Sequence, residues 1–305
     1  MKIVVTGSSG HIGGAAARLL HGQGHEVIGI SRTLSKGLRG HVEQLSLDIG
    51  HHSFVRDACK AIGDCDAIVH AAACQEHALT ALDIARTNCL GVQQILCMAT
   101  ELQAHTVVYL SSLSVLGAPC EHPVTETHPI APATVYGASK LFGEQLVCNA
   151  DAHALRGVAL RVSSPVGPGL NYKRIFRVFV ENAIAGRDIV LHGKGTRRQD
   201  YVDVRDIAEA IESALIRDVR GVFHIGAGVP VSNLELAEAC KETLASQSEI
   251  AFSGDPDPSD DVCWDISIEK ARKRLGYTPS HTLRQSIRDL AGEISGDSRP
   301  TEDGG

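Results

Sequence analysis

Short apolar runs alternate with longer segments of helical period along residues 1–165 of the chain. The valine-rich run 2–6 begins the series, and a helical pattern over 11–24 follows it. The further strands predicted here lie at 26–31, 42–48, 66–73, 106–112 and 157–163, and the further helices at 53–63, 78–101 and 134–150. Because this alternation builds right-handed strand–helix–strand units, we predict a doubly wound α/β domain whose parallel sheet is covered on both faces.

The pattern changes after residue 165, because the segment 163–172 is rich in proline and glycine and is typical of a loop leaving the sheet. Helices are predicted near 173–185, 204–217, 232–246, 267–275 and 282–294, with short strands near 188–191, 221–225 and 249–252. We interpret 166–199 and 226–293 as a smaller, mostly helical C-terminal part that binds the substrate. Residues 200–225 are expected to return to the first domain, and 294–305 to form a flexible tail.

Composition narrows the class of protein. The formal net charge of −7 argues against a nucleic-acid partner. No apolar run reaches the about 20 residues that span a bilayer, and no signal-peptide pattern is present, so we expect no membrane association and a cytoplasmic location. The nine cysteines include no C-x-x-C pair, which favours free thiols and predicts no metal site.

The first candidate site is the turn between the first strand and the first helix, GSSGHIGG. Gly7, Gly10 and Gly13 have the spacing that lets a backbone approach a pyrophosphate closely, and His11 and Ile12 lie between them. The N–H groups of the helix's first turn would then face the phosphates. A glycine-rich turn without a ligand is the alternative, but the strand before it and the helix after it favour a Rossmann-type dinucleotide site.

The end of the second strand bears on the choice of dinucleotide. Ser31 and Arg32 stand where an NAD site usually has an Asp or Glu for the ribose hydroxyls. Since an arginine attracts a 2′-phosphate, this favours NADP over NAD as the cofactor, unless Arg32 is a solvated surface residue. Asp48, with Ile49 after it, ends the third strand and is a candidate contact for adenine, or alternatively a capping residue.

The segment YGASK places Tyr136 and Lys140 on one face of a predicted helix. An ammonium beside a phenol stabilises the phenolate, and such a phenol can exchange a proton with an alcohol or a ketone. Hydroxyl side chains in SSLS end the fifth predicted strand at the sheet edge where ligands bind, and one of them can donate to the reacting oxygen. An amphipathic helix with a surface lysine is the alternative reading of Y-x-x-x-K.

Taken together, these motifs resemble the extended short-chain dehydrogenases/reductases of the NAD-dependent epimerase/dehydratase group. The resemblance extends over about residues 1–293 and includes VHAAA, TNCLG, SSLSVLG, ETHPIAPATVYGASK, LRVSSPVGPG, GKGTRRQDYVDVRDIAEAI and FHIGAG. It implies a catalytic trio of Ser112, Tyr136 and Lys140, in which Tyr136 is the acid/base and Lys140 also binds the nicotinamide ribose.

The same resemblance implies further roles. Asn88 would support the active site, and Ala71 and Ala72 would line the cofactor channel. Members of the group usually act on nucleotide-linked sugars and usually form dimers, through the helices near 78–101 and 134–150. We therefore expect a small-molecule substrate, most simply a nucleotide sugar, and a homodimer.

Departures from the group's pattern bear on which reaction the protein catalyses and which substrate it binds. Leu113 and Ser114 stand where sugar-nucleotide 4,6-dehydratases carry Asp-Glu, which argues against water elimination. Ser164 replaces an asparagine that often contacts the substrate diphosphate, and Val166 replaces a tyrosine. Arg198 is a candidate phosphate ligand or a loop cap. Ser114, Ser164 and Arg198 are thus the candidate substrate-binding residues.

The sequence therefore predicts a nicotinamide-dependent oxidoreductase that acts at a sugar carbinol or ketone, as a 4-epimerase or a ketoreductase. One alternative is an NADP-dependent reductase or dehydrogenase of a small non-nucleotide ketone or alcohol, and another is a cofactor-sensing protein without turnover. Glu76, in CQEHA, is either an extra base at the mouth of the site or a solvated loop carboxylate.

Overall fold

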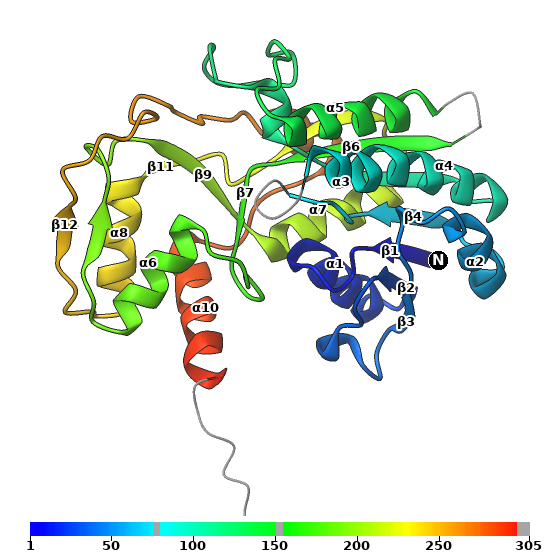
Figure 1. Cartoon of the computed structure of the whole chain (residues 1–305), viewed down its shortest axis with the longest axis horizontal. Helices are drawn as coiled ribbons and strands as arrows, with labels where there is room; N and C mark the ends of the chain where they lie inside the picture. Colours follow the sequence, from blue (N-terminus) through cyan, green and yellow to red (C-terminus); the bar gives the residue numbers. More distant parts are fainter. Residues whose placement is uncertain (76–79, 151–154, 298–305) are drawn as a thin grey trace, which may run out of the picture.

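A parallel sheet of seven strands forms the centre of the protein, in the order β10-β6-β5-β4-β1-β2-β3 (Figure 1). The structure, a computed structural model, describes residues 1–75, 80–150 and 155–297. The strands are β1 (Lys2–Thr6), β2 (Glu26–Ser31), β3 (Glu43–Ser46), β4 (Ala67–His70), β5 (Thr106–Ser112), β6 (Arg156–Val162) and β10 (Gly221–Ile225). The strand order reverses between β1 and β4, so the doubly wound fold predicted from the alternating pattern is confirmed.

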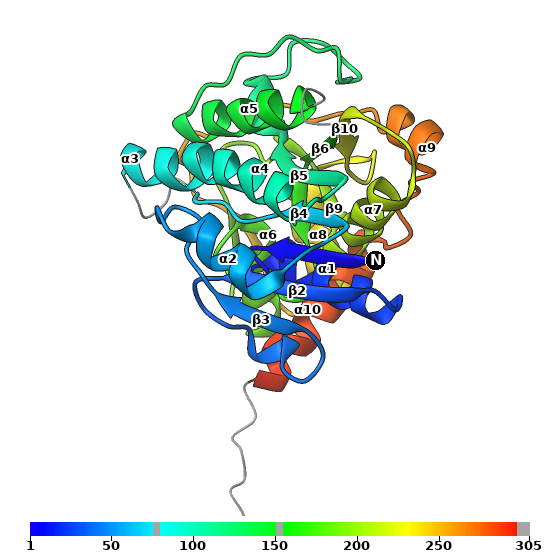
Figure 2. The same cartoon turned by 90° about the vertical axis from the view of Figure 1, so that its right-hand side faces the viewer.

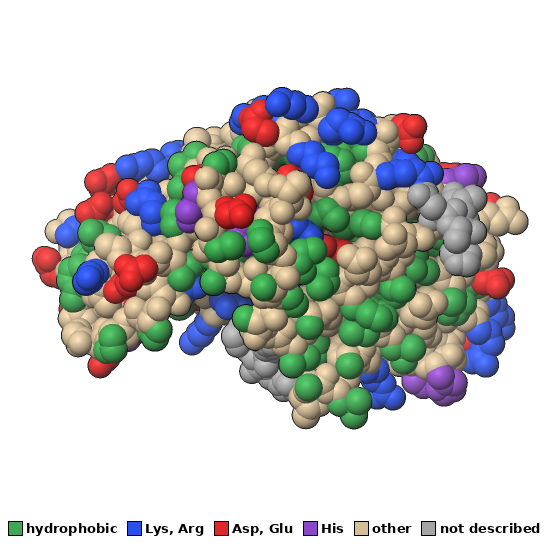
Figure 3. All heavy atoms as spheres, turned by 90° about the horizontal axis from the view of Figure 1, so that it is seen from above, with side chains coloured by type: hydrophobic (Ala, Val, Ile, Leu, Met, Phe, Trp, Pro, Cys, Tyr) green, Lys and Arg blue, Asp and Glu red, His purple; other side chains and the backbone are tan. Residues whose placement is uncertain are grey.

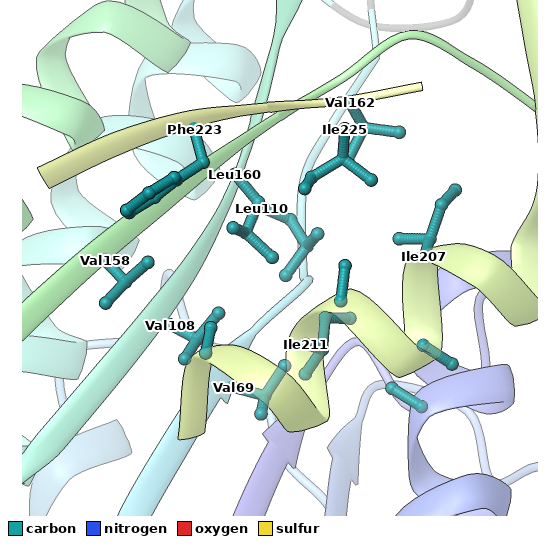
Figure 4. Close-up of a cluster of buried hydrophobic side chains, with 14 of the residues drawn as sticks. Val69, Val108, Leu110, Val158, Leu160, Val162, Ile207, Ile211, Phe223 and Ile225 are labelled. Atoms are coloured by element: carbon teal, nitrogen blue, oxygen red, sulfur yellow. The ribbon is translucent and has the colours of Figure 1, made fainter. Parts of the chain in front are cut away.

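Helices cover both faces of this sheet (Figure 2). On one face lie α1 (His11–Gly22), α7 (Val204–Ile216) and α9 (Glu269–Leu275), and on the other α2 (Phe54–Ile62), α4 (Gly91–Glu101) and α5 (Val135–Cys148). Alternate residues of each strand enter each core, and Figure 4 shows Val158, Leu160 and Val162 of β6 facing Ile207 and Ile211 of α7. None of the helices among the described residues is long and apolar enough to cross a membrane.

The long helix expected over 78–101 is not uniform. It is divided into α3 (Ala81–Ile84), a π-helical segment η2 (Ala85–Leu90) and α4, and its expected first two residues lie outside the described part. Thr80 and Asp83 form a capping box that begins α3. A π-helical turn inserted in a helix re-aims side chains and is frequent at functional sites. Here it carries Asn88.

A second, smaller part lies beside the carboxyl ends of the strands, at the left of Figure 1. It contains α6 (Ile175–Ile184), α8 (Asn233–Thr243) and α10 (Leu283–Asp297), which share one apolar core. Two small sheets complete it, β11 (Pro230–Ser232)–β9 (Arg198–Asp203)–β7 (Ser164–Val166) and β12 (Ile250–Phe252)–β8 (Ile189–Leu191).

Three strands of the small sheets were not expected from the pattern. β7 and β11 are too short for alternation to be visible, and β9 was assigned to no element. The segment 163–172, interpreted as a loop, therefore begins with a strand that pairs in parallel with β9. At the other end, α10 continues to Asp297, so residues 294–297 are helical and not part of a tail. The remaining residues, 298–305, are outside the described part.

Helix α5 approaches the sheet closely because glycines stand at its contact points. A Cβ on Gly157 of β6 would lie 1.9 Å from the Val147 carbonyl oxygen, and one on Gly143 would lie 2.3 Å from the Tyr109 hydroxyl. At the first turn, a Cβ on Gly137 would lie 2.5 Å from the Ser114 carbonyl oxygen. These contacts hold the helix that carries Tyr136 and Lys140 along β6, β5 and the turn after β5.

We expect Gly157→Ala to lower the free energy of unfolding by about 1–3 kcal/mol, because the new methyl group meets backbone and not a side chain that could turn away. Gly22→Ala is the matched control, since nothing lies within 4 Å of its Cβ position, and it should be neutral or stabilise by up to about 1 kcal/mol. Urea unfolding of the two variants measures the difference. Equal stability of the two variants would contradict the close seating of α5.

Candidate active site

A cleft of about 680 Å³ lies between the carboxyl edge of the large sheet and the second part. One wall consists of the glycine turn and the ends of β4, β5 and β6 with α5, and the opposite wall consists of the 170–176 segment, β9 and the start of α8. Among the sequence candidates, the residues that line it are Gly7, Gly10, His11, Ile12, Gly13, Ala71, Ser112, Tyr136, Lys140 and Ser164. The fold thus brings the glycine turn and the Ser112, Tyr136 and Lys140 side chains to one cleft.

The glycine turn is shaped for a close backbone approach. Gly7 has φ +71°, and a Cβ there would lie 2.6 Å from the Ala72 nitrogen. A Cβ on Gly13 would lie 2.2 Å from the Gly7 carbonyl oxygen. Gly10 precedes α1 without a side-chain cap, and no acidic residue stands in the first turn, so the N–H groups there have no side-chain acceptor and suit a phosphate. The turn therefore fits a dinucleotide.

His11 connects this turn to the opposite wall. Its Nε2 atom lies 3.0 Å from the Pro168 carbonyl oxygen, and its ring lies edge-on to Tyr172 at 6.2 Å between centroids. Burial lowers the pKa of His11 to about 4, so the imidazole is neutral at physiological pH. A neutral ring adds no charge to the phosphate side of the cleft.

The candidates for the adenosine half lie outside the cleft lining. The Ser31 hydroxyl lies 3.2 Å from that of Ser8 and donates to the Thr33 carbonyl, and Arg32 is exposed after the end of β2. Asp48 accepts a hydrogen bond from the Gly50 nitrogen at 2.9 Å, as a turn residue does. Ile49 is buried in the core under α2 and α4.

Three side chains of the expected catalytic trio come from two neighbouring elements. Ser112 ends β5, and its hydroxyl accepts from the Ser114 nitrogen at 3.2 Å, which begins a short 3₁₀ turn, η3 (Leu113–Leu116). Thr134 caps α5 through the Gly137 nitrogen, so Tyr136 lies in the first helical turn. The structure brings all three to the cleft.

The Lys140 ammonium is the charged centre of this wall. It is 3% exposed, donates to the Leu110 carbonyl at 2.6 Å, and lies 5.8 Å from the centroid of the Tyr136 ring. Burial lowers the pKa of Lys140 to about 7, and the nearby Glu144 carboxylate opposes this by raising it. A cation at this distance favours the ionised form of a phenol.

Asn88 of η2 connects two segments that lie next to the site. Its amide oxygen accepts from the Cys74 nitrogen at 2.7 Å, and its amide nitrogen donates to the Cys74 carbonyl and to the Ser139 hydroxyl, each at 2.9 Å. Ser139 is the neighbour of Lys140 and in turn donates to the Tyr136 carbonyl. Asn88 therefore ties the loop after β4 to α5 and does not line the cleft.

Two of the three candidate substrate residues lie elsewhere. The Arg198 guanidinium donates to the Pro230 carbonyl at 2.8 Å and pairs with Glu235 at 3.0 Å, so it does not line the cleft. The Ser114 hydroxyl is buried without a partner among the described residues, also off the lining. Ser164 does line the cleft, where its hydroxyl lies 3.3 Å from the Gln199 amide.

Arg197 and Arg174 line the cleft instead, and sequence analysis missed them. Side chains alternate along an extended chain, so Arg197, Gln199 and Tyr201 face the cleft while Arg198 does not. This alternation becomes informative only once the pairing of β9 is known. In the orientation that satisfies both ends of its amide, Gln199 accepts from Arg197 Nε and Nη2 at 3.0 and 2.9 Å. Gln199 thereby orients the Arg197 guanidinium.

The charge of the cleft is positive. No Asp or Glu is among the lining residues that the structure describes, whereas Arg174, Arg197 and Lys140 are. Figure 3 shows Lys and Arg side chains in the notch that separates the two parts of the molecule. Glu76, the candidate extra base, lies outside the described residues. Within the described chain no cluster of His, Cys, Asp and Glu could hold a metal ion.

A glycine turn at the first strand, a Ser, Tyr and Lys set beside it, and a cationic opposite wall define a dinucleotide-dependent α/β enzyme. The model of the NAD dependent epimerase/dehydratase family matches residues 3–226, and the chain belongs to this family. The resemblance inferred from the motifs is thereby confirmed, together with an NAD-dependent enzyme as the class of activity.

Characterised relatives cover most of the chain. A dTDP-glucose 4,6-dehydratase of Streptomyces niveus is 30% identical over 92% of this chain and 88% of its own length. A UDP-glucose 4-epimerase of Corynebacterium glutamicum is 29% identical over 95% of this chain and 94% of its own. The solved UDP-glucose 4-epimerase of Thermotoga maritima shares the fold with a TM-score of 0.88, 23% identity and coverage of 98% of this chain and all of that one.

Proposed function

We propose that the protein is an NAD(P)-dependent sugar-nucleotide epimerase, which removes hydride from a sugar carbinol and returns it to the other face. The observation that carries this proposal is the single cleft that joins the glycine turn, Ser112, Tyr136 and Lys140 to a wall bearing Arg174 and Arg197. A substrate that needs both walls has a carbinol at one end and an anionic group at the other. A nucleotide diphosphate sugar meets both requirements.

In this proposal each polar side chain of the cleft has one role. When bound, the nicotinamide cofactor supplies the acceptor and donor of hydride. Tyr136 takes the hydroxyl proton as the carbinol is oxidised and returns it on reduction. The Lys140 ammonium stabilises the Tyr136 phenolate, and the Ser112 hydroxyl donates to the reacting oxygen. Arg174 and Arg197 bind the diphosphate.

Dehydration is a weaker proposal, although a dehydratase is among the relatives. Elimination of water needs an additional acid and base beside the catalytic hydroxyl. Here the buried Leu113 and the neutral Ser114 occupy that place, and the cleft has no carboxylate among its described residues. This favours chemistry that moves hydride and one proton only.

A ketoreductase that uses NADPH is the second candidate, and Ser31 and Arg32 favour it. At the end of β2 the exposed Arg32 can pair with a 2′-phosphate, and no carboxylate stands there to bind the ribose hydroxyls of NAD. A small non-nucleotide ketone is the alternative substrate, motivated by Ser164 and Val166.

We propose a homodimer that forms through α3, η2 and α5. Leu82 is 77% exposed, and Leu90, Val135 and Phe142 are also exposed on these elements. Hydrophobic side chains gather over this part of the surface in Figure 3. A second copy of the chain would remove this apolar area from water.

Tyr136→Phe should lower the rate of UDP-glucose and UDP-galactose interconversion by about 10²-fold or more, because the acid/base is removed. Binding of NAD, measured as a rise in melting temperature, should remain. An interconversion rate equal to that of the wild type would end the proposal. Nicotinamide in the supernatant of denatured protein, at one per chain, would support the epimerase, and an empty site the ketoreductase.

Arg197→Ala should weaken UDP binding by about 10- to 100-fold, the effect of losing a charged hydrogen-bond donor. Arg198→Ala is the matched control and should bind UDP within about twofold of the wild type, because its guanidinium pairs with Glu235 away from the cleft. Calorimetric titration measures both. If Arg198→Ala weakened UDP binding more than Arg197→Ala, the diphosphate would lie on the other side of β9.

Arg32→Asp should shift the ratio of NADP to NAD affinity toward NAD by about tenfold or more, since a carboxylate repels the 2′-phosphate and accepts from the ribose hydroxyls. Fluorescence titration with NADPH and NADH measures the ratio. An unchanged ratio would show that Arg32 does not contact the adenosine half.

A further inference from the structure

Helix α5 presents three ionisable side chains to the sheet at successive turns: Tyr136, Lys140 and Glu144. The third has no part in the reaction proposed above. Glu144 is 2% exposed, and both oxygens of its carboxylate accept hydrogen bonds from neighbouring side chains. Its Oε1 accepts from Arg161 Nε at 2.9 Å and from the Ser111 hydroxyl at 2.5 Å, and its Oε2 accepts from Arg161 Nη2 at 2.8 Å.

These contacts join α5 to the two strands that end at the cleft. Ser111 of β5 and Arg161 of β6 are direct partners in the sheet register, so one carboxylate holds both strand ends. Ser111 lies between Leu110, whose carbonyl accepts from Lys140, and Ser112, whose hydroxyl lines the cleft. A shift of Glu144 would therefore move Lys140 and Ser112 relative to each other.

Glu144 also affects the charge of Lys140. The charged or titratable groups that interact with the ammonium are Tyr136 and Glu144 on α5, Tyr109 on β5 and His70 on β4. Burial keeps His70 neutral by lowering its pKa to about 3, and raises the pKa of Tyr109. The Glu144 carboxylate raises the pKa of Lys140 and so opposes the effect of burial.

We propose that Glu144 is a positioning residue for the reaction: with Arg161 and Ser111 it fixes α5 over the ends of β5 and β6, and its negative charge stabilises the buried Lys140 ammonium. The inference rests on the proposed function for its catalytic consequence. Its electrostatic part concerns only this chain's own residues and can be measured without substrate or cofactor.

A buried ion pair could instead serve the fold alone, and the two roles differ in what they change. A structural pair alters stability when it is broken. A positioning pair also alters the pH at which Lys140 and Tyr136 exchange protons. The experiment therefore measures two midpoints, the alkaline limb of the pH profile of kcat and the ionisation of Tyr136. The second is read as phenolate absorbance in the cofactor-free protein, relative to the same variant carrying Tyr136→Phe.

Glu144→Gln is expected to move these midpoints in opposite directions. Without the carboxylate the pKa of Lys140 falls further, so the ammonium is lost at lower pH and the alkaline limb of kcat shifts down by about one pH unit. The Tyr136 phenolate, no longer beside a cation, forms at higher pH. kcat should fall by about tenfold or more, with KM within about twofold. Glu144→Asp, which keeps the charge, should restore both midpoints even if kcat remains low.

Two more variants separate position from charge. Ser111→Ala keeps the ion pair and should lower kcat without moving either midpoint. Asp206→Asn is the structural control, because that carboxylate is buried and bonded to Ser280 and His281 away from the cleft; it should lower the melting temperature and leave both midpoints unchanged.

If Glu144→Gln does not fold, Glu144→Leu combined with Arg161→Met replaces the pair by apolar groups of similar volume, an exchange that proteins tolerate. A folded double variant with the wild-type Tyr136 midpoint and the wild-type kcat would overturn the inference. If the wild type converts no nucleotide sugar, the proposed function fails. A raised Tyr136 midpoint in the Glu144 variants would then still support the electrostatic part, and an unchanged one would overturn it.

Discussion

The close packing of α5 along β5 and β6 is the constraint on which the site depends. Tyr136 and Lys140 reach the cleft at the sheet edge because their helix lies close against the strands. Glycines remove the side chains that would keep it away, at Gly137, Gly143 and Gly157. Hydrogen bonds then fix the position of α5 along the strands. Asn88 bonds to Ser139 near the start of the helix, and Arg161 bonds to Glu144 one turn further along. Close approach and fixed register together bring a phenol, an ammonium and a serine hydroxyl to one wall.

The second part completes the site because the chain crosses to it at the end of β6. β7 follows Val162 at once and pairs with β9, so the opposite wall is connected directly to the end of β6. Asp200 of β9 connects this wall to two other segments. Its buried carboxylate accepts hydrogen bonds from the Ser163 hydroxyl and from the backbone nitrogens of Ala227 and Gly228. Loss of these bonds would free the wall that carries Arg197.

The electrostatics of the cleft follow from the same arrangement. Glu144, Asp200 and Glu235 lie near the site but do not line the cleft, and each accepts hydrogen bonds from neighbouring donors, whereas Arg174, Arg197 and Lys140 line it. An anion that entered the cleft would thus meet cations with little competition from acidic neighbours. A buried ammonium is costly unless an anion is near, and Glu144 meets that need one helical turn away.

Much of this protein could be predicted from the residues alone, because the strongest signals are local. Glycine spacing at a strand–helix turn and Y-x-x-x-K on a helix identified the glycine turn, Tyr136, Lys140 and the family, and the alternating pattern identified the sheet. The wall of the cleft opposite α5 could not be predicted in the same way. β7 and β11 are three residues each, so alternation cannot appear in them, and only the pairing of β9 with both decides that Arg197 faces the cleft and Arg198 does not. The partner of Glu144 also depends on contacts between distant segments, since Ser111 and Arg161 become its neighbours only when β5 and β6 pair beneath α5.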